Sequence, residues 1–296
     1  MQKMIKCFIS ITFLLLLLSC SQDNNVQTER SSDKSKEKTV QILVIGVDSR
    51  GEASSRSDAM LIVQYSPNNK SLKIASLMRD SYVKIPTYEK SFNKLNMAYF
   101  LGGEELLVKT IEENFKISID HTITIDFEGF AYIVDAVAPN GIEVEVSEAM
   151  IKDMNFQMKP GKNKLHGNDL LKYVRFRHDE NSDFGRVARQ QEVVMKVKDA
   201  FLKDMNTTEQ LFMLPNIMEG AEKYVSSDIS FTESLSIISL LVANSVEKVS
   251  TITIPVQNSF KDNSYEHAGA VLELDIGKNQ EALKEFFEPP IEVNTK

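Results

Sequence analysis

The segment from Val40 to Asp48, VQILVIGVD, constrains the fold more than any other because it is an almost continuous run of β-branched and apolar residues. Such a run is typical of a strand buried on both faces. The segments AMLIVQYS (59–66) and SLKIASLM (71–78) follow, and only the turn sequence PNNK separates them. We therefore expect these two segments to form an antiparallel hairpin beside the first strand.

Helical and strand patterns alternate along the rest of the chain. GGEELLVKTIEENF (102–115) has apolar residues at helical spacing, and the helical segment FEGFAYIVDAV (127–137) lies between the strands HTITID and GIEVEV. Residues 185–202, LFMLPNIM and FTESLSIISLLVANSV are predicted helices, VSTITIPV a late strand and GKNQEALKEFF a closing helix. This alternation predicts an α/β layered domain with a central mixed β-sheet flanked by helices. Residues 206–247 could form a helical subdomain, but we favour a single domain over residues 40–290.

The N-terminus has the features of a bacterial lipoprotein signal. Two lysines precede the apolar run from Phe8 to Leu18, and LLSC ends at Cys20. The run is shorter than the roughly 20 residues that span a membrane, and it suits the apolar region of a secretory signal. We predict a signal peptide at 1–19, lipidation of Cys20, a polar disordered tether at 20–39, and a location on the extracytoplasmic face of the cytoplasmic membrane. The alternatives are an uncleaved signal anchor or an ordinary cleavage site.

Charge and cysteine content exclude several classes of protein. The formal net charge of −8 disfavours nucleic acid as a partner, since nucleic-acid binding usually needs a basic stripe. Of the two cysteines, one lies in the signal and the other is Cys20, so no thiol is left for catalysis. The four histidines are scattered without zinc-type spacing.

Arginine is rare and is placed beside aspartate. The chain has eight arginines and 26 lysines, and outside the tether the arginines lie in GVDSRGEASSRSD, LMRD and RFRHDENSDFGR. The arginine fork donates two parallel hydrogen bonds to a phosphate or a carboxylate. Asp48, Asp58 and Asp80 lie at predicted strand ends, and carboxylate oxygens there suit Mg²⁺. The pattern predicts a magnesium–arginine site for a phosphorylated ligand, whereas ordinary intramolecular salt bridges are the alternative.

Five ordered blocks resemble the LytR-CpsA-Psr family of bacterial envelope proteins. They are ILVIGVDSRGEASSRSDAMLIV, IASLMRDSYVKIP, KLNMAYFLGGEELLVKTIEENFKISID, FEGFAYIVDAV and YVRFRHDENSDFGRVARQQ, and the likeness runs from Val40 to Phe201. The resemblance implies an exported α/β/α sandwich with an apolar cavity for a prenyl tail. It also implies Mg²⁺-dependent transfer (Mn²⁺ is an alternative ion) of an anionic glycopolymer from a polyprenyl (pyro)phosphate lipid to peptidoglycan. Teichoic acid and capsular polysaccharide are the usual polymers of the family.

The resemblance also implies roles for individual residues. Asp48 and Asp58 would hold the metal. Asp183 and Arg189 would orient the phosphate-binding groups, and the hydroxyl proton would pass to Asp80 or, as second choice, to Asp183, although Asp80 could equally be a structural partner of Arg79. The expected phosphate and substrate contacts are Arg50, Arg56, Arg79, Arg175, Arg177, Arg186, Arg189 and Gln190, and the expected cavity residues are Phe100, Phe127, Phe130 and Ile133.

The chain departs from the family pattern in a few places. Met78 precedes Arg79 where proline is frequent, and Ser182 replaces a usual glycine. The predicted lipid anchor replaces the usual transmembrane helix. The alternatives to transfer are a hydrolase that cleaves the polyprenyl pyrophosphate with the same residues and a non-enzymatic lipoprotein that binds anionic envelope polymers. A transcription regulator is disfavoured by the secretion signal and the acidic charge.

Overall fold

The structure of the chain is a computed structural model that describes residues 39–48, 55–179, 182–204, 214–243 and 246–288. The described residues belong to one compact unit, Glu37–Lys296. The predicted signal peptide, Cys20, the tether up to residue 38 and Arg50 lie outside the described residues. No helix in the described ranges is long and apolar enough to cross a membrane.

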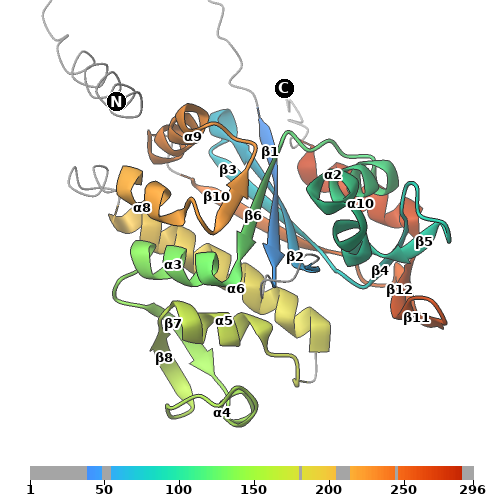
Figure 1. Cartoon of the computed structure of the whole chain (residues 1–296). Helices are drawn as coiled ribbons and strands as arrows, with labels where there is room; N and C mark the ends of the chain where they lie inside the picture. The colour runs from blue at the N-terminus through green and yellow to red at the C-terminus, as the bar shows by residue number, and fades with distance from the viewer. Residues whose placement is uncertain (1–38, 49–54, 180–181, 205–213, 244–245, 289–296) are drawn as a thin grey trace, which may run out of the picture. The chain divides into compact units, whose positions relative to one another are not determined.

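A six-stranded mixed sheet forms the centre of this unit, in the order β10-β3-β2-β1-β6-β9 (Figure 1). Strand β1 is antiparallel to β2 and parallel to β6, and β2 is antiparallel to β3, so the predicted hairpin and mixed sheet are confirmed. Strand β10 is parallel to β3, and β9 is antiparallel to β6. The strand bounds are β1 (Val40–Val47), β2 (Ser57–Ser66), β3 (Ser71–Leu77), β6 (His121–Asp126), β9 (Val225–Ser227) and β10 (Lys248–Ile254).

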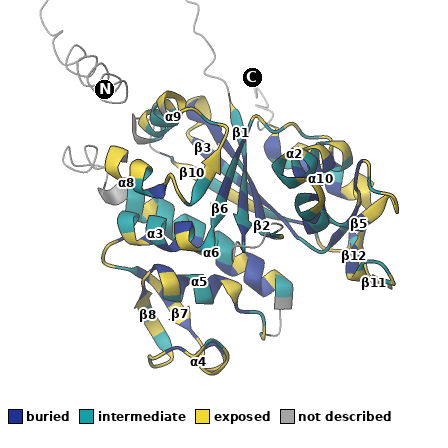
Figure 2. Ribbon diagram, in the orientation of Figure 1, coloured by how far each residue is buried: buried dark blue, intermediate teal, exposed yellow. Residues whose placement is uncertain are grey.

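Helices cover both faces of this sheet, which confirms the predicted α/β/α sandwich (Figure 1). One face packs on α2 (Leu95–Phe115) and α10 (Ile276–Phe287), where Leu43 and Ile45 of β1 share an apolar core with Leu107. The other face packs on α6 (Ser182–Asp204) and α9 (Phe231–Ala243), where Val44 meets Val194. Neighbouring residues of β1 thus enter different cores, as the two-residue period of a strand requires. The central strands are accordingly among the most buried parts of the described chain (Figure 2).

Helix α2 begins earlier than the sequence predicts and is interrupted at the two glycines. The prediction started the helix at Gly102, but the structure has helix from Leu95 onward. Gly102 and Gly103 have non-helical backbone angles, and Gly103 has φ of 64°, in the region that glycine adopts without a steric penalty. The glycine pair therefore separates two helical segments of α2, and the predicted helix is the second of them.

The structure also contains elements that the sequence did not reveal. A second sheet has the order β11-β12-β4-β5, and β8 forms a separate hairpin with β7, which is the predicted strand GIEVEV. These strands are short and partly exposed, so they lack the apolar runs of the central strands. Their bounds are β4 (Ser81–Lys84), β5 (Phe92–Lys94), β7 (Ile142–Val146), β8 (Gly161–Leu165), β11 (Phe260–Tyr265) and β12 (Gly269–Leu274). The remaining helices are α3 (Phe127–Val137), α4 (Glu148–Met154), α5 (Gly167–Arg175) and α8 (Leu214–Ala221).

Candidate functional site

The sheet topology brings the predicted aspartates and arginines to one edge. Strands β1, β3 and β6 run in the same direction, because β1 and β3 are both antiparallel to β2 and β6 is parallel to β1. Their carboxyl ends therefore meet at the edge where ligands usually bind in open α/β sheets. Asp48 follows β1, Arg79 follows β3, and Asp58 lies at the start of β2, where Val47 pairs with Ser57.

Ion pairs join these residues across the edge. Nη1 of Arg79 lies 2.5 Å from Oδ1 of Asp58, and its Nε lies 3.3 Å from Oδ2 of Asp80. Arg175, the last residue of α5, lies 3.9 Å from Asp48. The pair between Arg175 and Asp48 links segments that are more than a hundred residues apart in the sequence, so distant blocks of the chain meet at this edge.

The first turns of α6 complete the cluster. Asp183 lies 3.1 Å from Arg186 and 3.6 Å from Arg177. Arg186 and Gln190 are four residues apart on this helix, so they share a face, and both line the same pocket. Arg177 reaches that pocket from the extended segment after α5, and Phe176 beside it lies between the pocket wall and an apolar core.

Arg186 is the least satisfied charge of the cluster. It is 3% exposed. Its Nη1 lies 3.1 Å from the Asp183 carboxylate, but neither Nη1 nor Nε makes a well-aligned hydrogen bond in the described part of the chain. Burial, followed by the positive charge of Arg177, lowers the pKa of Arg186 to about 10. A buried cation with unsatisfied donors is costly. An anion beside it would offset that cost, so Arg186 indicates an anionic ligand.

The neighbouring groups differ in how well they are paired. Burial and then the charge of Arg79 lower the pKa of Arg177. Burial opposes ionisation of Arg79 too, but Asp80 and Asp58 outweigh it and raise the pKa of Arg79. Burial likewise disfavours the Asp80 carboxylate, yet the hydrogen bond from Lys94 and the charge of Arg79 hold its pKa below the usual value. Asp80 is therefore a poor proton acceptor and is better described as the ion-pair partner of Arg79 and Lys94.

An apolar cavity of about 180 Å³ lies between the central sheet and helices α3, α5 and α6. Phe127 and Phe130 line it, as the resemblance implies, together with Gly46, Leu61 and Val194. The guanidinium of Arg175 lies 4.3 Å from the ring centre of Phe127, within the range of a cation–π interaction. A cavity with such walls suits a hydrocarbon chain.

Two of the predicted cavity residues lie elsewhere. Ile133 of α3 is not part of the cavity wall. Phe100 belongs to α2, which packs on the opposite face of the sheet, and its ring lies 5.6 Å from the guanidinium of the exposed Arg56. The correction has a simple reason, because the pattern of a single helix does not reveal which face of the sheet that helix covers.

A cationic pocket of about 300 Å³ adjoins the apolar cavity. The two share Asp58, Arg175 and Gln190 in their walls. The other residues that line the cationic pocket are Asp153, Met154, Phe176, Arg177, His178 and Arg186. An apolar cavity that leads into a group of arginines is complementary to an amphiphile with a hydrocarbon tail and an anionic head.

The contacts of Arg189 favour one of the two roles predicted for it, which were to orient the phosphate-binding groups and to contact the substrate. Its guanidinium donates to the Asp179 carboxylate and, at 2.5 Å, to the carbonyl oxygen of Phe176, and it lies over the Phe176 ring. The side chain is 8% exposed and lines none of the pockets described here. Arg189 therefore holds the segment that carries Arg177 and is not a substrate contact. This fits the orienting role that the resemblance implied.

Two positions escaped the sequence reasoning. Lys94 at the end of β5 lies 2.8 Å from Asp80, and only the fold of the second sheet brings it there. Gly185 in α6 approaches Asp179 so closely that an added Cβ would lie 2.6 Å from the carboxylate oxygens. The sequence signal for Gly185 was its position between Asp183 and Arg186, where a small residue allows the loop to pass close to the helix.

Asp48 and Asp58 suit a divalent cation that binds together with phosphate. Their carboxylate oxygens are the ligands that Mg²⁺ prefers, and this ion commonly takes one or two carboxylates with substrate phosphates and water. Within the described ranges, no group of three or more His, Cys, Asp or Glu residues could hold a metal ion. Asp58 lines the cationic pocket with Arg186, whose unsatisfied donors are consistent with a phosphate that would complete the coordination.

The chain is similar in sequence to a known protein family and to several characterised proteins. Residues 17–285 match the model of the LytR_cpsA_psr family. The regulatory protein MsrR of Staphylococcus aureus is 35% identical over 249 residues, which cover 84% of this chain and 74% of MsrR. TagU of Bacillus cereus, named polyisoprenyl-teichoic acid–peptidoglycan teichoic acid transferase, is 33% identical over 197 residues, which cover 66% of this chain and 62% of TagU.

A solved structure shares the fold as well. The family protein YwtF (TagT) with bound octaprenyl pyrophosphate matches with a TM-score of 0.63 and 27% identity, over 85% of this chain and 90% of TagT. The family match covers most of the chain, and the five sequence blocks predicted the same assignment. The chain belongs to the LytR_cpsA_psr family.

Proposed function

We propose that the protein transfers an anionic glycopolymer of the teichoic acid class from a polyprenyl pyrophosphate carrier to peptidoglycan. The observation that carries the proposal is the apolar cavity that leads into a cationic pocket with a buried, unsatisfied arginine. The transferase name of TagU and the octaprenyl pyrophosphate bound to TagT support it.

In this reaction a sugar hydroxyl of peptidoglycan attacks the phosphorus that carries the first sugar of the polymer. A bond forms between the hydroxyl oxygen and this phosphorus, the bond to the bridging oxygen of the pyrophosphate breaks, and polyprenyl phosphate leaves. The arginines stabilise the negative charge on the phosphate oxygens, so catalysis consists mainly of positioning and electrostatics.

Each residue of the cluster has a place in this scheme. Phe127 and Phe130 bind the prenyl chain, and Arg175, Arg177 and Arg186 bind the phosphates. Arg79 and Asp80 form a paired support, because each charge favours the ionised form of the other. We assign acceptance of the hydroxyl proton to Asp183, because Asp80 is held ionised by Lys94 and Arg79.

Asp48 and Asp58 would hold Mg²⁺ or Mn²⁺ against the pyrophosphate. Such an ion, when bound, neutralises the charge that develops on the leaving phosphate. The proposed metal requirement predicts that chelation abolishes transfer and that either ion restores it.

The test is a transfer assay with purified protein, lipid-linked polymer and uncrosslinked peptidoglycan. We expect polymer on the glycan and release of polyprenyl phosphate, and about a 10–100-fold loss in Arg177→Ala, since this arginine is about one-third exposed and loses only part of a buried contact. Release of polyprenyl phosphate at the same rate without peptidoglycan would identify a hydrolase. Polymer binding without any turnover would identify a binding protein.

We also propose that lipid on Cys20 anchors the protein at the outer face of the cytoplasmic membrane. Replacement of Cys20 by serine should then abolish lipid attachment, because the lipid is carried on the cysteine thiol. Metabolic labelling of cells with radioactive palmitate, followed by immunoprecipitation of the protein, measures this. A wild-type protein that takes up no label would indicate an ordinary cleavage site or an uncleaved signal anchor.

A further inference from the structure

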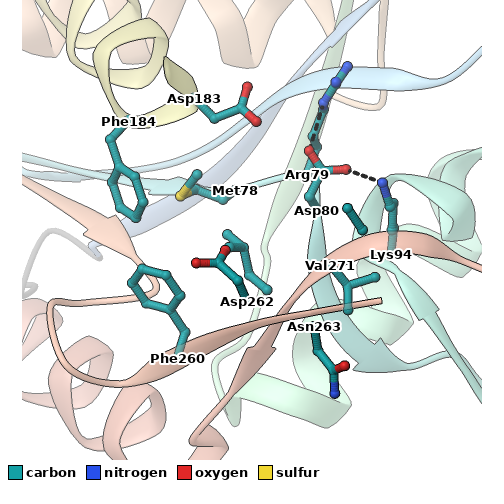
Figure 3. A pocket seen from close by; sticks show the side chains of 12 residues that line it. Met78, Arg79, Asp80, Lys94, Asp183, Phe184, Phe260, Asp262, Asn263 and Val271 are labelled. Carbon is teal, nitrogen blue, oxygen red and sulfur yellow. Dashed lines mark hydrogen bonds and ion pairs between the residues drawn. The ribbon is translucent and has the colours of Figure 1, made fainter. Parts of the chain in front are cut away.

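A third pocket, of about 430 Å³, has Arg79 of the arginine cluster in its wall (Figure 3). Helix α6, the turn after β3 and the β11–β12 hairpin enclose it. Its walls are formed by Met78, Arg79, Asp80, Lys94, Asp183, Phe184, Phe260, Asp262, Asn263, Ala270, Val271 and Leu272. We propose that this pocket binds the acceptor, a neutral glycan chain whose hydroxyl attacks the phosphorus. The inference rests on the proposed function.

The position of the pocket matches the geometry that the reaction needs. The third pocket has no wall residue in common with the apolar cavity or the cationic pocket. It meets the cationic pocket through two contacts, Arg79 to Asp58 and Asp183 to Arg186. The phosphate region thus lies between the cavity for the leaving prenyl phosphate and the third pocket. In phosphoryl transfer the attacking and leaving oxygens are roughly in line, so the nucleophile should enter from the third pocket.

The charges of the two polar pockets assign donor and acceptor to different places. The third pocket is lined by the cations Arg79 and Lys94 and by three carboxylates, those of Asp80, Asp183 and Asp262. The cationic pocket instead has three arginines and two aspartates in its walls. The excess of carboxylates in the third pocket repels a polymer with repeated phosphate charges, whereas the excess of arginines in the cationic pocket attracts it. A neutral sugar has no such preference, so the third pocket suits an uncharged acceptor.

Two aromatic rings give the third pocket a surface that can hold a sugar. The rings of Phe184 and Phe260 lie 5.5 Å apart at an angle of 30°, and Figure 3 shows both on one side of the pocket with Asp262 nearby. Phe184 is 36% exposed although it is a large apolar residue. The apolar face of a sugar ring can pack on such rings, while a carboxylate accepts hydrogen bonds from its hydroxyls.

Variants at Phe184 and Asp262 test the inference, because both side chains are accessible and neither belongs to the phosphate-binding cluster. In transfer assays with saturating lipid-linked polymer, Phe184→Ala and Asp262→Ala should each raise the KM for uncrosslinked glycan strands about tenfold. The KM for the lipid-linked donor should not change. The matched control is Phe92→Ala, which removes a 42% exposed ring of the same small sheet outside the pocket.

A second measurement keeps this inference separate from the proposed function. Saturation-transfer NMR with a soluble, uncrosslinked glycan fragment should detect binding to the wild-type protein and to Phe92→Ala, but weaker binding to Phe184→Ala. If the glycan fragment binds Phe184→Ala more weakly than the other two proteins but no transfer occurs, the proposed function is contradicted and the assignment of the third pocket to the glycan is supported. Transfer by the wild-type protein with an unchanged acceptor KM in both pocket variants, or a raised donor KM instead, would overturn the pocket assignment.

Discussion

Replacing Arg186 with methionine is expected to reduce glycopolymer transfer by about 10²–10³-fold, because it removes a buried donor to the transferred phosphate. The same change should leave the free energy of unfolding unchanged or raise it. Arg186 is buried with unsatisfied donors, and its neighbour Arg177 disfavours its charge. An apolar side chain of similar length avoids that desolvation cost, while Asp183 stays one-third exposed and keeps its contact with Arg177. Arg186 therefore lowers the stability of the ligand-free protein, and its function is to bind the ligand.

Transfer assays and urea unfolding of the same preparations measure both effects. Thermal melts with a short-chain polyprenyl pyrophosphate add a direct readout of binding, because a ligand that binds only the folded state raises Tm. We expect a clear rise for the wild-type protein and a smaller one for Arg186→Met. Transfer within fivefold of the wild-type rate would show that Arg186 does not contact the phosphate.

Replacing Arg189 with methionine should have the opposite balance of effects. Here the folded protein is expected to lose about 1.5–3 kcal/mol of stability, the usual cost of removing a hydrogen bond to a charged group. Arg189 is buried on the same helix as Arg186, but it is paired with Asp179 and with the carbonyl oxygen of Phe176. Its loss leaves the Asp179 carboxylate beside α6 without this cation and loosens the segment that carries Arg177.

The two arginine variants are matched controls for each other, since they make the same substitution on one helix. Urea unfolding should give a higher free energy of unfolding for Arg186→Met than for Arg189→Met. Transfer by Arg189→Met should fall less than transfer by Arg186→Met when both are assayed well below their unfolding midpoints. A fully stable Arg189→Met protein with abolished transfer would instead place Arg189 in contact with the substrate.

The parts of the fold that the sequence predicted are those with strong local signals. The apolar run of β1 and the turn between β2 and β3 identified the centre of the sheet, because buried strands need continuous apolar residues. The β11–β12 hairpin was missed, since FKDNSY is mostly polar and its pairing with β4 is a long-range contact. Such strands are stabilised by their neighbours and have little intrinsic signal of their own.

For the site, too, one part was predicted from the sequence and another part was not. The clustering of Arg79, Arg175 and Arg186 with aspartates was predicted, because arginine is rare in this chain and these positions lie at element ends. Their separate roles were not predicted. Arg186 and Arg189 are three residues apart and chemically identical, yet one faces a pocket and the other holds a loop.

The sequence by itself determined the family, the order of the central elements and the set of charged residues that meet at the sheet edge. Only the tertiary structure decided which side each group faces. It placed Phe100 across the sheet from the apolar cavity, paired Asp80 with Lys94, and enclosed a third pocket between α6 and the second sheet. The physical reason is that residue type and spacing are local properties. Burial, ion pairing and pocket walls depend on segments that are distant in the chain and become neighbours only on folding.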